Sequence, residues 1–321
     1  MTHQVVFTDH TFENLDIERE ILAEADVELV DAAASDESLS GLVTDADGIL
    51  VMFNEIDADL IRRMGECEVI SRTGIGLDNI DIDAATEAGI HVTNVPDYCI
   101  PEVADHTLGL ALALQRKIIE YNRSVENGEW DVSAGRPMHR LTEQTWGLIG
   151  YGNIARAVSD RVEATRMDRI AFDAFLDDEM IRDNGVEPTE SLDELLGRAD
   201  IVSVHVPLTD ETEHMIGRAE LEAMQNDAYL INCARGGIVD EDALADALDS
   251  GEIAGTGLDV LAEEPPAEDH PLVDNDRAII TPHAAYSSEE SVIELRQKAA
   301  RNARDVLVGE SPAYSINGED L

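Results

Sequence analysis

The stretch Trp146-Gly147-Leu148-Ile149-Gly150-Tyr151-Gly152-Asn153-Ile154-Ala155 decides the fold of this chain. Its apolar start predicts a strand, and a glycine-rich turn then opens a helix that we expect to end near Glu163. Gly150 permits a tight turn, Gly152 lets the backbone approach a pyrophosphate, and the helix N-terminus supplies N–H donors. We therefore predict a dinucleotide site that includes Gly150, Gly152, Asn153 and Ile154.

The next predicted strand supports this interpretation. Ile170–Asp173 ends about twenty residues after the turn, where a carboxylate would accept from the adenosine ribose. The residues that follow Asp173 include no arginine to hold a 2′-phosphate, which favours NAD over NADP and leaves NADP open. The alternative is a structural glycine turn followed by a solvent-facing aspartate.

Short β-branched runs alternate with amphipathic segments along the whole chain, which predicts parallel α/β sheets. The other predicted strands are Val5–Thr8, Gly48–Phe53, Val69–Thr73, His91–Asn94, Ile201–Val206, Ala228–Asn232, Thr256–Asp259 and Ile279–Thr281. We expect long helices over Pro101–Asn127 and from Ser288 to about Val308.

This order predicts two Rossmann-like domains, each with a doubly wound parallel sheet, and an active-site cleft between them. Residues 100–287 would form the NAD-binding domain. Residues 1–99 with 288–321 would form a flavodoxin-like, substrate-binding (catalytic) domain.

The charge is unusual: 69 Asp and Glu face 22 Lys and Arg, for a formal net charge of −47 over 321 residues. Such self-repulsion destabilises a compact state in dilute buffer, whereas molar salt shortens the screening length to about 3 Å. The acidic residues are spread along the chain rather than gathered in a tail or a patch. The sequence thus favours adaptation to high salt and argues against binding to nucleic acid or to an anionic membrane.

The remaining composition bounds the class of protein. Cys67, Cys99 and Cys233 lie far apart, and the histidines have no ligand spacing, so we expect neither disulfides nor a metal site. No stretch approaches the length of a membrane span, and the N-terminus has no signal-peptide pattern. We expect a cytoplasmic protein in a high-salt cytoplasm.

Three further segments end predicted strands of the central domain: Asn232–Gly237, Leu258–Pro266 and Thr281–Ala285. With these motifs in this order, the chain from Val69 to about Ala300 strongly resembles the D-isomer-specific 2-hydroxyacid dehydrogenases, in an acidic, haloarchaeal-type version. The resemblance implies hydride transfer between NADH and a 2-oxo acid, giving the D-2-hydroxy acid.

The resemblance also assigns roles to residues. Arg235 matches the arginine that binds the substrate carboxylate, for which a guanidinium fork is suited. His283 matches the general acid/base, and Glu264 matches its partner, since a neighbouring carboxylate favours the imidazolium. Each residue alone could equally be structural: a helix cap, a solvated loop carboxylate or a packed turn histidine. His205 is interpreted as structural because the resemblance already supplies a proton donor.

A loop at the end of a predicted N-terminal strand, Arg72-Thr73-Gly74-Ile75, resembles the family's loop that binds the substrate carboxylate. Arg72 matches a second arginine in the subgroup of C-terminal-binding proteins, and Tyr286 stands where that subgroup has a tryptophan. By the same resemblance, the NAD site would also include Ile75, Val206, Cys233, Ala234, Arg235, Asp259, His283 and Ala285. An exposed surface ion pair is the alternative for Arg72.

Two other interpretations stay open at this point. An NAD(H)-sensing protein that recognises partners, like the C-terminal-binding corepressors, is the main one, although Arg235, Glu264 and His283 argue for catalysis. Formate dehydrogenase fits poorly, because that branch pairs a glutamine with its histidine. The apolar Pro101–Asn127 segment, with the resemblance, predicts a homodimer.

Overall fold

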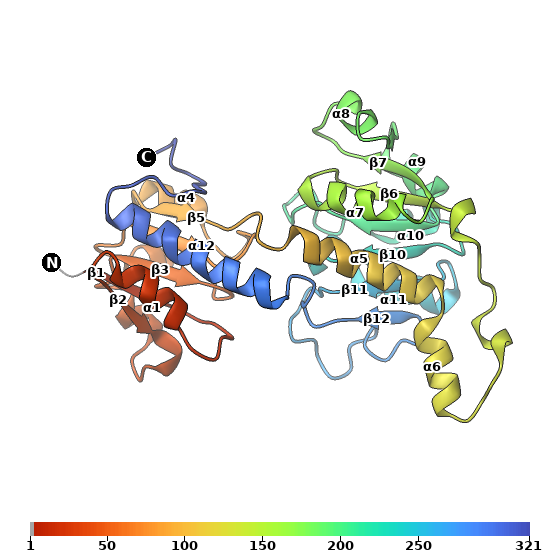
Figure 1. Cartoon of the computed structure of the whole chain (residues 1–321), viewed down its shortest axis with the longest axis horizontal. Coiled ribbons are helices and arrows are strands. Elements are labelled where there is room, and N and C mark those ends of the chain that lie inside the picture. Colours follow the sequence, from red (N-terminus) through yellow and green to blue (C-terminus); the bar gives the residue numbers. More distant parts are fainter. Residues whose placement is uncertain (1–2) are drawn as a thin grey trace. The chain divides into compact units, whose positions relative to one another are not determined.

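The computed structural model describes residues 3–321 and divides the chain into two compact units (Figure 1). Unit 1 comprises residues 1–98 and 288–321, and unit 2 comprises residues 99–287. All strand pairs in both units are parallel, as the alternating pattern predicts. Each unit is therefore an α/β layer structure in its own right.

Unit 1 has a five-stranded sheet in the order β2-β1-β3-β4-β5, the doubly wound order of flavodoxin-like folds. Its strands are β1 (His3–Phe7), β2 (Val27–Asp31), β3 (Gly48–Val51), β4 (Val69–Arg72) and β5 (His91–Thr93). Its helices are α1 (Asp16–Ala23), α2 (Leu39–Leu42), α3 (Ala58–Ile61), α4 (Ile82–Glu87) and α12 (Glu289–Leu307), with the 3-10 turn η1 (Ala32–Ala34).

Unit 2 has a seven-stranded sheet in the order β12-β11-β10-β9-β6-β7-β8. Its strands are β6 (Thr145–Ile149), β7 (Asp168–Phe172), β8 (Glu187–Pro188), β9 (Ile201–Val204), β10 (Tyr229–Asn232), β11 (Gly255–Leu258) and β12 (Ala278–Ile280). Its helices are α5 (Ile100–Gln115), α6 (Ile118–Glu126), α7 (Asn153–Glu163), α8 (Asp178–Arg182), α9 (Leu192–Arg198), α10 (Arg218–Ala223) and α11 (Glu241–Ser250), with 3-10 turns η2 (Val132–Gly135), η3 (Leu141–Glu143) and η4 (Gly236–Ile238). The chain order reverses between β6 and β9, where a Rossmann fold binds its ligand.

The sheet of unit 2 is apolar on both faces, which explains why its strands read as continuous apolar runs. Neighbouring residues of one strand enter different cores: Leu230 packs with α9, α10 and α11, whereas Ile231 packs with α5 and α7. Figure 1 shows α5 and α7 side by side over one face of this sheet. Helices on both faces hold the strand ends at fixed positions.

In unit 1, α12 lies beside α1 over the sheet (Figure 1), so the end of the chain completes the domain that its beginning started. An almost fully buried ion pair joins the two helices. Glu18, 1% exposed, accepts hydrogen bonds of 2.7 Å from Nε and Nη2 of Arg296. Arg296 also donates to the Asn14 carbonyl at 2.6 Å, and its guanidinium lies 4.5 Å from the Phe12 ring centre.

All ten predicted strands are present, with ends that differ by one or two residues. Two strands were missed, and both lie at sheet edges. β2 is only partly buried, and β8 consists of two residues, one of them a proline that a sheet tolerates only at its edge.

The predicted Pro101–Asn127 helix is wrong in one respect, because it is two helices. Lys117 adopts a left-handed conformation (φ 53°), and its N–H bonds to the Leu114 carbonyl three residues back, which ends the α-helical ladder. The Lys117 ammonium lies 3.3 Å from Glu120 and 5.2 Å from the Tyr229 ring centre. These contacts stabilise a break that no glycine or proline marks in the sequence.

Replacing Glu18 by alanine should lower the free energy of unfolding of unit 1 by about 3–5 kcal/mol, because Arg296 would stay buried without its partner. Urea unfolding in molar KCl, followed by circular dichroism, measures this. Glu20→Ala on the exposed face of α1 is the control and should change little. A parent-like midpoint for Glu18→Ala would show that the pair does not stabilise the unit.

Candidate active site

The glycine turn after β6 has the geometry that a dinucleotide requires. Gly150 has φ +81°, and a Cβ there would lie 2.8 Å from Cγ1 of Val206. Gly152 is the N-cap of α7, and a Cβ there would meet no atom within 4 Å. Ala155 is fully buried between α7 and the sheet. The start of α7 is thus uncrowded at Gly152, and a helix N-terminus of this kind favours a pyrophosphate.

Asp173 is tied to this turn. It directly follows β7, which ends at Phe172, one residue earlier than predicted. Its Oδ2 accepts from the Tyr151 N–H at 2.7 Å, and its Oδ1 accepts from the N–H groups of Phe175 and Leu176 at 2.9 and 3.0 Å. The carboxylate is therefore held beside the glycine turn.

Arg235 follows β10 in a turn that is shaped by Asn232. The Asn232 side chain accepts from the Ala234 N–H at 2.9 Å and donates to the Arg235 carbonyl at 2.8 Å. A Cβ on Gly236 would overlap the backbone of Leu261 and Ala262, so only glycine lets the two loops approach this closely. The turn that carries Arg235 thus packs against the loop that carries Glu264.

Glu264 and His283 form a direct hydrogen bond. Oε2 of Glu264 lies 2.7 Å from Nδ1 of His283, while its Oε1 accepts from the Leu261 N–H at 3.0 Å. Burial acts to raise the pKa of Glu264, but the hydrogen bond and the charge of His283, with Arg235 nearby, lower it overall. The carboxyl group therefore stays ionised to lower pH than an ordinary glutamate.

The loop that carries His283 depends on Asp259, which is 1% exposed. Its Oδ1 accepts from the Thr281 hydroxyl at 2.6 Å and from the Ala284 N–H at 2.9 Å, and its Oδ2 accepts from the Ala285 N–H at 2.8 Å. The His283 N–H donates to the Asp259 carbonyl at 2.8 Å, although the histidine has φ 50°. One carboxylate holds a strained loop in place.

Sequence reasoning missed two supports of this loop, Thr281 and His106. Because the Thr281 hydroxyl donates to Asp259, it accepts from Nε2 of His106, at 2.9 Å. His106 also lies 3.5 Å from Asp259. No motif marks His106, because it lies on α5, far in sequence from the loop that it supports.

The other predicted residues of unit 2 lie around these loops. The Tyr286 ring meets the His283 ring edge-on at 6.3 Å. Burial raises the pKa of the Cys233 thiol to about 12, so it is not a thiolate nucleophile. Burial lowers the pKa of His205 to about 3, and its Nε2 lies 2.8 Å from the Ser203 hydroxyl. His205 is therefore neutral at physiological pH.

In unit 1, the Arg72–Ile75 loop follows β4. The Arg72 guanidinium donates to the Thr73 carbonyl and lies where a Cβ on Gly74 would be. The Ile75 carbonyl accepts from the Asn94 side chain at 2.8 Å, and the Gly74 carbonyl accepts from the Val95 N–H at 2.9 Å. These bonds fix the loop at the carboxyl end of the sheet of unit 1.

Comparison with known proteins matches this arrangement to a family. The model of the D-isomer specific 2-hydroxyacid dehydrogenase NAD-binding domain matches residues 108–285, which carry the glycine turn and the Arg235, Glu264 and His283 loops. This chain belongs to the D-isomer-specific 2-hydroxyacid dehydrogenase family. Unit 2 is its NAD-binding domain, and the family consists of oxidoreductases that act on CH–OH groups.

Individual members of this family are similar to the chain over most of its length. The glyoxylate reductase of Thermofilum pendens is 39% identical over 89% of this chain and 86% of its own length. The D-3-phosphoglycerate dehydrogenase of Methanocaldococcus jannaschii is 40% identical, but this chain spans about half (53%) of its length. The structure of the D-lactate dehydrogenase of Aquifex aeolicus with NAD and lactic acid has a TM-score of 0.90 and 29% identity, over 98% of this chain and 99% of that one. The predicted fold of two parallel-sheet α/β domains and the predicted dehydrogenase family are confirmed.

Among residues 3–321, no group of three or more His, Cys, Asp or Glu side chains is placed to hold a metal ion. Over the same residues, none of the helices has the length and apolar character needed to cross a membrane.

Proposed function

We propose that this chain reduces a 2-oxo acid to the D-2-hydroxy acid with NADH, using Arg235, Glu264 and His283. The observation that carries the proposal is the 2.7 Å hydrogen bond between Glu264 and His283 in an NAD-binding unit. Both residues, and Arg235, follow strands of one parallel sheet, at the edge where such sheets bind ligands.

NAD fits the residues present. Gly150, Gly152, Asn153 and Ile154 would hold the pyrophosphate at the start of α7, and Asp173 would accept from the adenosine ribose. When bound, NADH supplies the hydride. The other residues that we propose to line this site are Ile75, Val206, Cys233, Ala234, Arg235, Asp259, His283 and Ala285. The carboxylate of Asp259 has a mainly structural role, because it already accepts three hydrogen bonds within the protein.

Arg235 would bind the substrate carboxylate through two parallel N–H···O bonds, which fix the orientation of the carbonyl carbon. The turn imposed by Asn232 and Gly236 supports this role, because it fixes the backbone of Arg235. Arg72, Thr73, Gly74 and Ile75 would add a second group of donors for the carboxylate. Tyr286, beside His283, would contact the side chain of the substrate.

His283 would protonate the carbonyl oxygen during reduction and take the proton back during oxidation. Since Nδ1 is engaged by Glu264, Nε2 is the nitrogen that would hold the transferable proton. The ionised Glu264 favours the imidazolium, the form that donates.

The substrate is a small 2-oxo acid whose side chain is to be found by experiment. A panel of glyoxylate, pyruvate, longer 2-oxo acids, phenylpyruvate and phosphohydroxypyruvate, assayed with NADH in molar KCl, covers the activities for which the relatives are named. Normal NADH binding without turnover of any of them would contradict the proposal and favour an NAD(H)-sensing protein.

His283→Ala should reduce kcat by about 10²–10⁴-fold, the usual contribution of a positioned acid. In Glu264→Gln, the loss of reduction at alkaline pH should move to lower pH, because an amide does not favour the imidazolium. Arg235→Ala should damage both KM and kcat. Steady-state kinetics beside NADH fluorescence titration measures this. NADH binding, which depends mainly on the Gly150–Ile154 turn and on Asp173, should weaken far less than turnover in all three variants. Near-full kcat in His283→Ala at every pH would place the proton donor elsewhere.

Asp173→Ala should erode a preference for NADH over NADPH, because it removes the acceptor for the ribose hydroxyl and the repulsion of a 2′-phosphate. The ratio of kcat/KM for the two cofactors measures this. Asp177→Ala, four residues further on, is a control that should keep the ratio. Equal kcat/KM values for NADH and NADPH in the parent protein would contradict the assignment of NAD.

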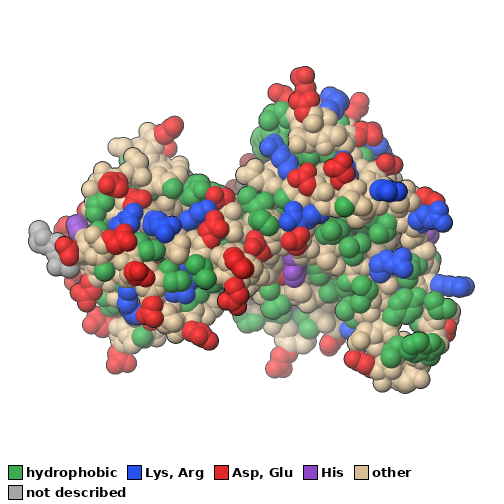
Figure 2. Space-filling view, viewed as in Figure 1, with side chains coloured by type: hydrophobic (Ala, Val, Ile, Leu, Met, Phe, Trp, Pro, Cys, Tyr) green, Lys and Arg blue, Asp and Glu red, His purple; other side chains and the backbone are tan. Residues whose placement is uncertain are grey.

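We also propose that the chain forms a homodimer through α6 and the segment after it. Leu110 and Leu114, which suggested an interface in the sequence, are buried in unit 2, whereas other apolar side chains are exposed. These define the α6 patch: Ile118, Ile119, Val125, Trp130 and Val132, of which Trp130 is 91% exposed. Figure 2 shows the apolar surface gathered over α6. A patch of this kind usually marks an interface.

Light scattering in molar KCl should therefore give twice the 35.0 kDa of one chain. Trp130→Ser combined with Val125→Ser should shift the mass toward the monomer. Phe175→Ser removes an apolar side chain that is equally exposed but lies outside the α6 patch, and it should leave the mass unchanged. A monomeric parent protein would refute the dimer.

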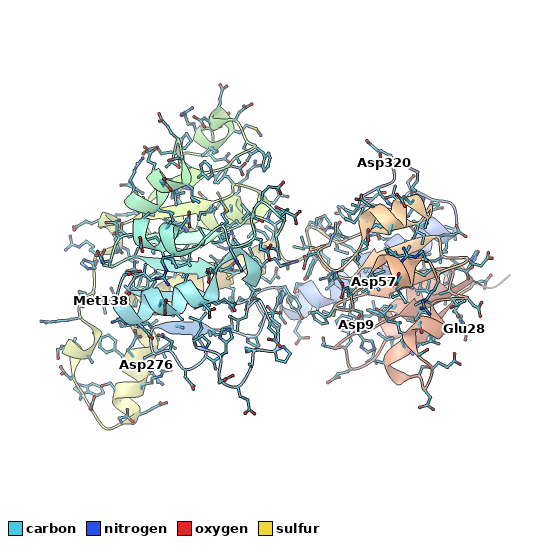
Figure 3. The ribbon with its side chains drawn as sticks, turned by 180° about the vertical axis from the view of Figure 1, so that it is seen from behind. Asp9, Glu28, Asp57, Met138, Asp276 and Asp320 are labelled. Carbon is cyan, nitrogen blue, oxygen red and sulfur yellow. The ribbon has the colours of Figure 1, made fainter. Side chains whose placement is uncertain are left out.

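Finally, we propose that the protein works at high salt. The carboxylates are distributed over the surface, as Figure 2 shows from one side and the labelled Asp9, Glu28, Asp57, Asp276 and Asp320 show in Figure 3 from behind. Their repulsion should unfold or dissociate the protein in dilute buffer. Thermal unfolding across a KCl series measures this, and an unfolding temperature that does not depend on salt would overturn it.

A further inference from the structure

The mechanism does not use the largely buried acid–imidazole pair formed by Glu241 and His270. Glu241 is the first residue of α11, and its Oε1 accepts from the Ala262 N–H at 2.7 Å. Its Oε2 lies 3.0 Å from Nε2 of His270. The side chains of Glu241 and His270 are only 15% and 13% exposed.

The hydrogen bonds of His270 show which of its ring nitrogens carries the proton. Its Nδ1 accepts from the Leu272 N–H at 3.3 Å, so the ring proton lies on Nε2 and is donated to Glu241. Leu272 is fully buried in the core of unit 2, and the backbone N–H of His270 donates to the Ala267 carbonyl at 3.1 Å. The imidazole therefore links the Glu241 carboxylate to the backbone of the buried Leu272.

The residue that Glu241 holds, Ala262, lies two positions before Glu264. On its other side the same stretch is packed against Gly236, where no Cβ fits. Glu264 itself accepts from the Leu261 N–H at 3.0 Å while it reaches His283. A shift of the Ala262 backbone would therefore move the carboxylate that contacts His283.

We propose that Glu241, oriented by His270, is a positioning residue that holds the 261–264 loop so that Glu264 can bond to His283. Its effect on turnover rests on the proposed function, whereas its effect on the His283 ring does not. The competing explanation is a general one, since acidic residues in the first turn of any helix stabilise it. Asp242, the exposed neighbour of Glu241 on the same turn, would share that effect but not the contact with Ala262.

The contacts described here run from His270 through Glu241 and Ala262 to Glu264 and His283. Glu264 faces the His283 ring, with the Tyr286 ring at its edge, and Arg235 acts on Glu264. Glu241 faces His270. A change in the titration of His283 in a Glu241 variant would thus report on Glu264.

The experiment compares the parent, Glu241→Ala and the control Asp242→Ala as full chains in molar KCl. Nuclear magnetic resonance follows the titration of the His283 ring, assigned by its loss in His283→Gln. Glu241→Ala should lower the titration midpoint of His283, in the same direction as Glu264→Gln, and Asp242→Ala should not. Where turnover is measurable, kcat should fall by up to about 10²-fold, as misplacement near a site can cause. NADH affinity should be unchanged.

Variants of His270 give an independent test if Glu241→Ala folds poorly. His270→Gln keeps an N–H donor toward Glu241 and should retain the parent midpoint, whereas His270→Ala should lower it. A parent-like His283 midpoint in both Glu241→Ala and His270→Ala would overturn the inference, even if the enzyme is active. Absence of turnover in the parent would instead overturn the proposed function, and the titration would still decide this one.

Discussion

The close packing of three loops at one end of the unit 2 sheet is the constraint on which the site depends. The loops after β10, β11 and β12 meet because Gly236 has no side chain and because the buried Asp259 carboxylate holds the loop after β12. A side chain at residue 236 would push the loops after β10 and β11 apart. Loss of the hydrogen bonds to Asp259 would release the loop after β12 and leave the Asp259 carboxylate buried without partners. The unpartnered buried charge alone would cost several kcal/mol. The positions of Arg235, Glu264 and His283 thus depend on how the backbones of these three loops pack.

This arrangement explains why residues far apart in the chain act together. In a parallel sheet every strand delivers its carboxyl end to the same edge, and the chain order reverses beside β6. Gly150, Arg235, Glu264 and His283 therefore lie on loops of one edge. Family membership agrees with this geometry, because the matched region covers all four loops. The relatives reported above differ in the side chain of the substrate that each name gives.

The fold could be predicted from the sequence because both sheets are parallel and buried, so that strands appear as apolar runs. The parts that could not be predicted lack such a signal. β8 is too short for a pattern, and the break at Lys117 is stabilised by contacts with Glu120 and Tyr229. The main residues of the site lie in recognisable motifs, whereas their supports do not. Asn232 and Thr281 act through their own loops, but His106 reaches its loop from α5, at a distance in sequence that no local pattern encodes.

High salt would divide the electrostatic interactions of this chain into two kinds. At a screening length of about 3 Å, most of its surface ion pairs would contribute little, and the excess of carboxylates would be tolerated. Interactions that exclude water would keep their strength. These include the buried Glu18–Arg296 pair and the Asp259 network. The hydrogen bond between Glu264 and His283 is partly exposed, but its length of 2.7 Å is within the screening length, so a chain with a net charge of −47 can keep this contact in high salt.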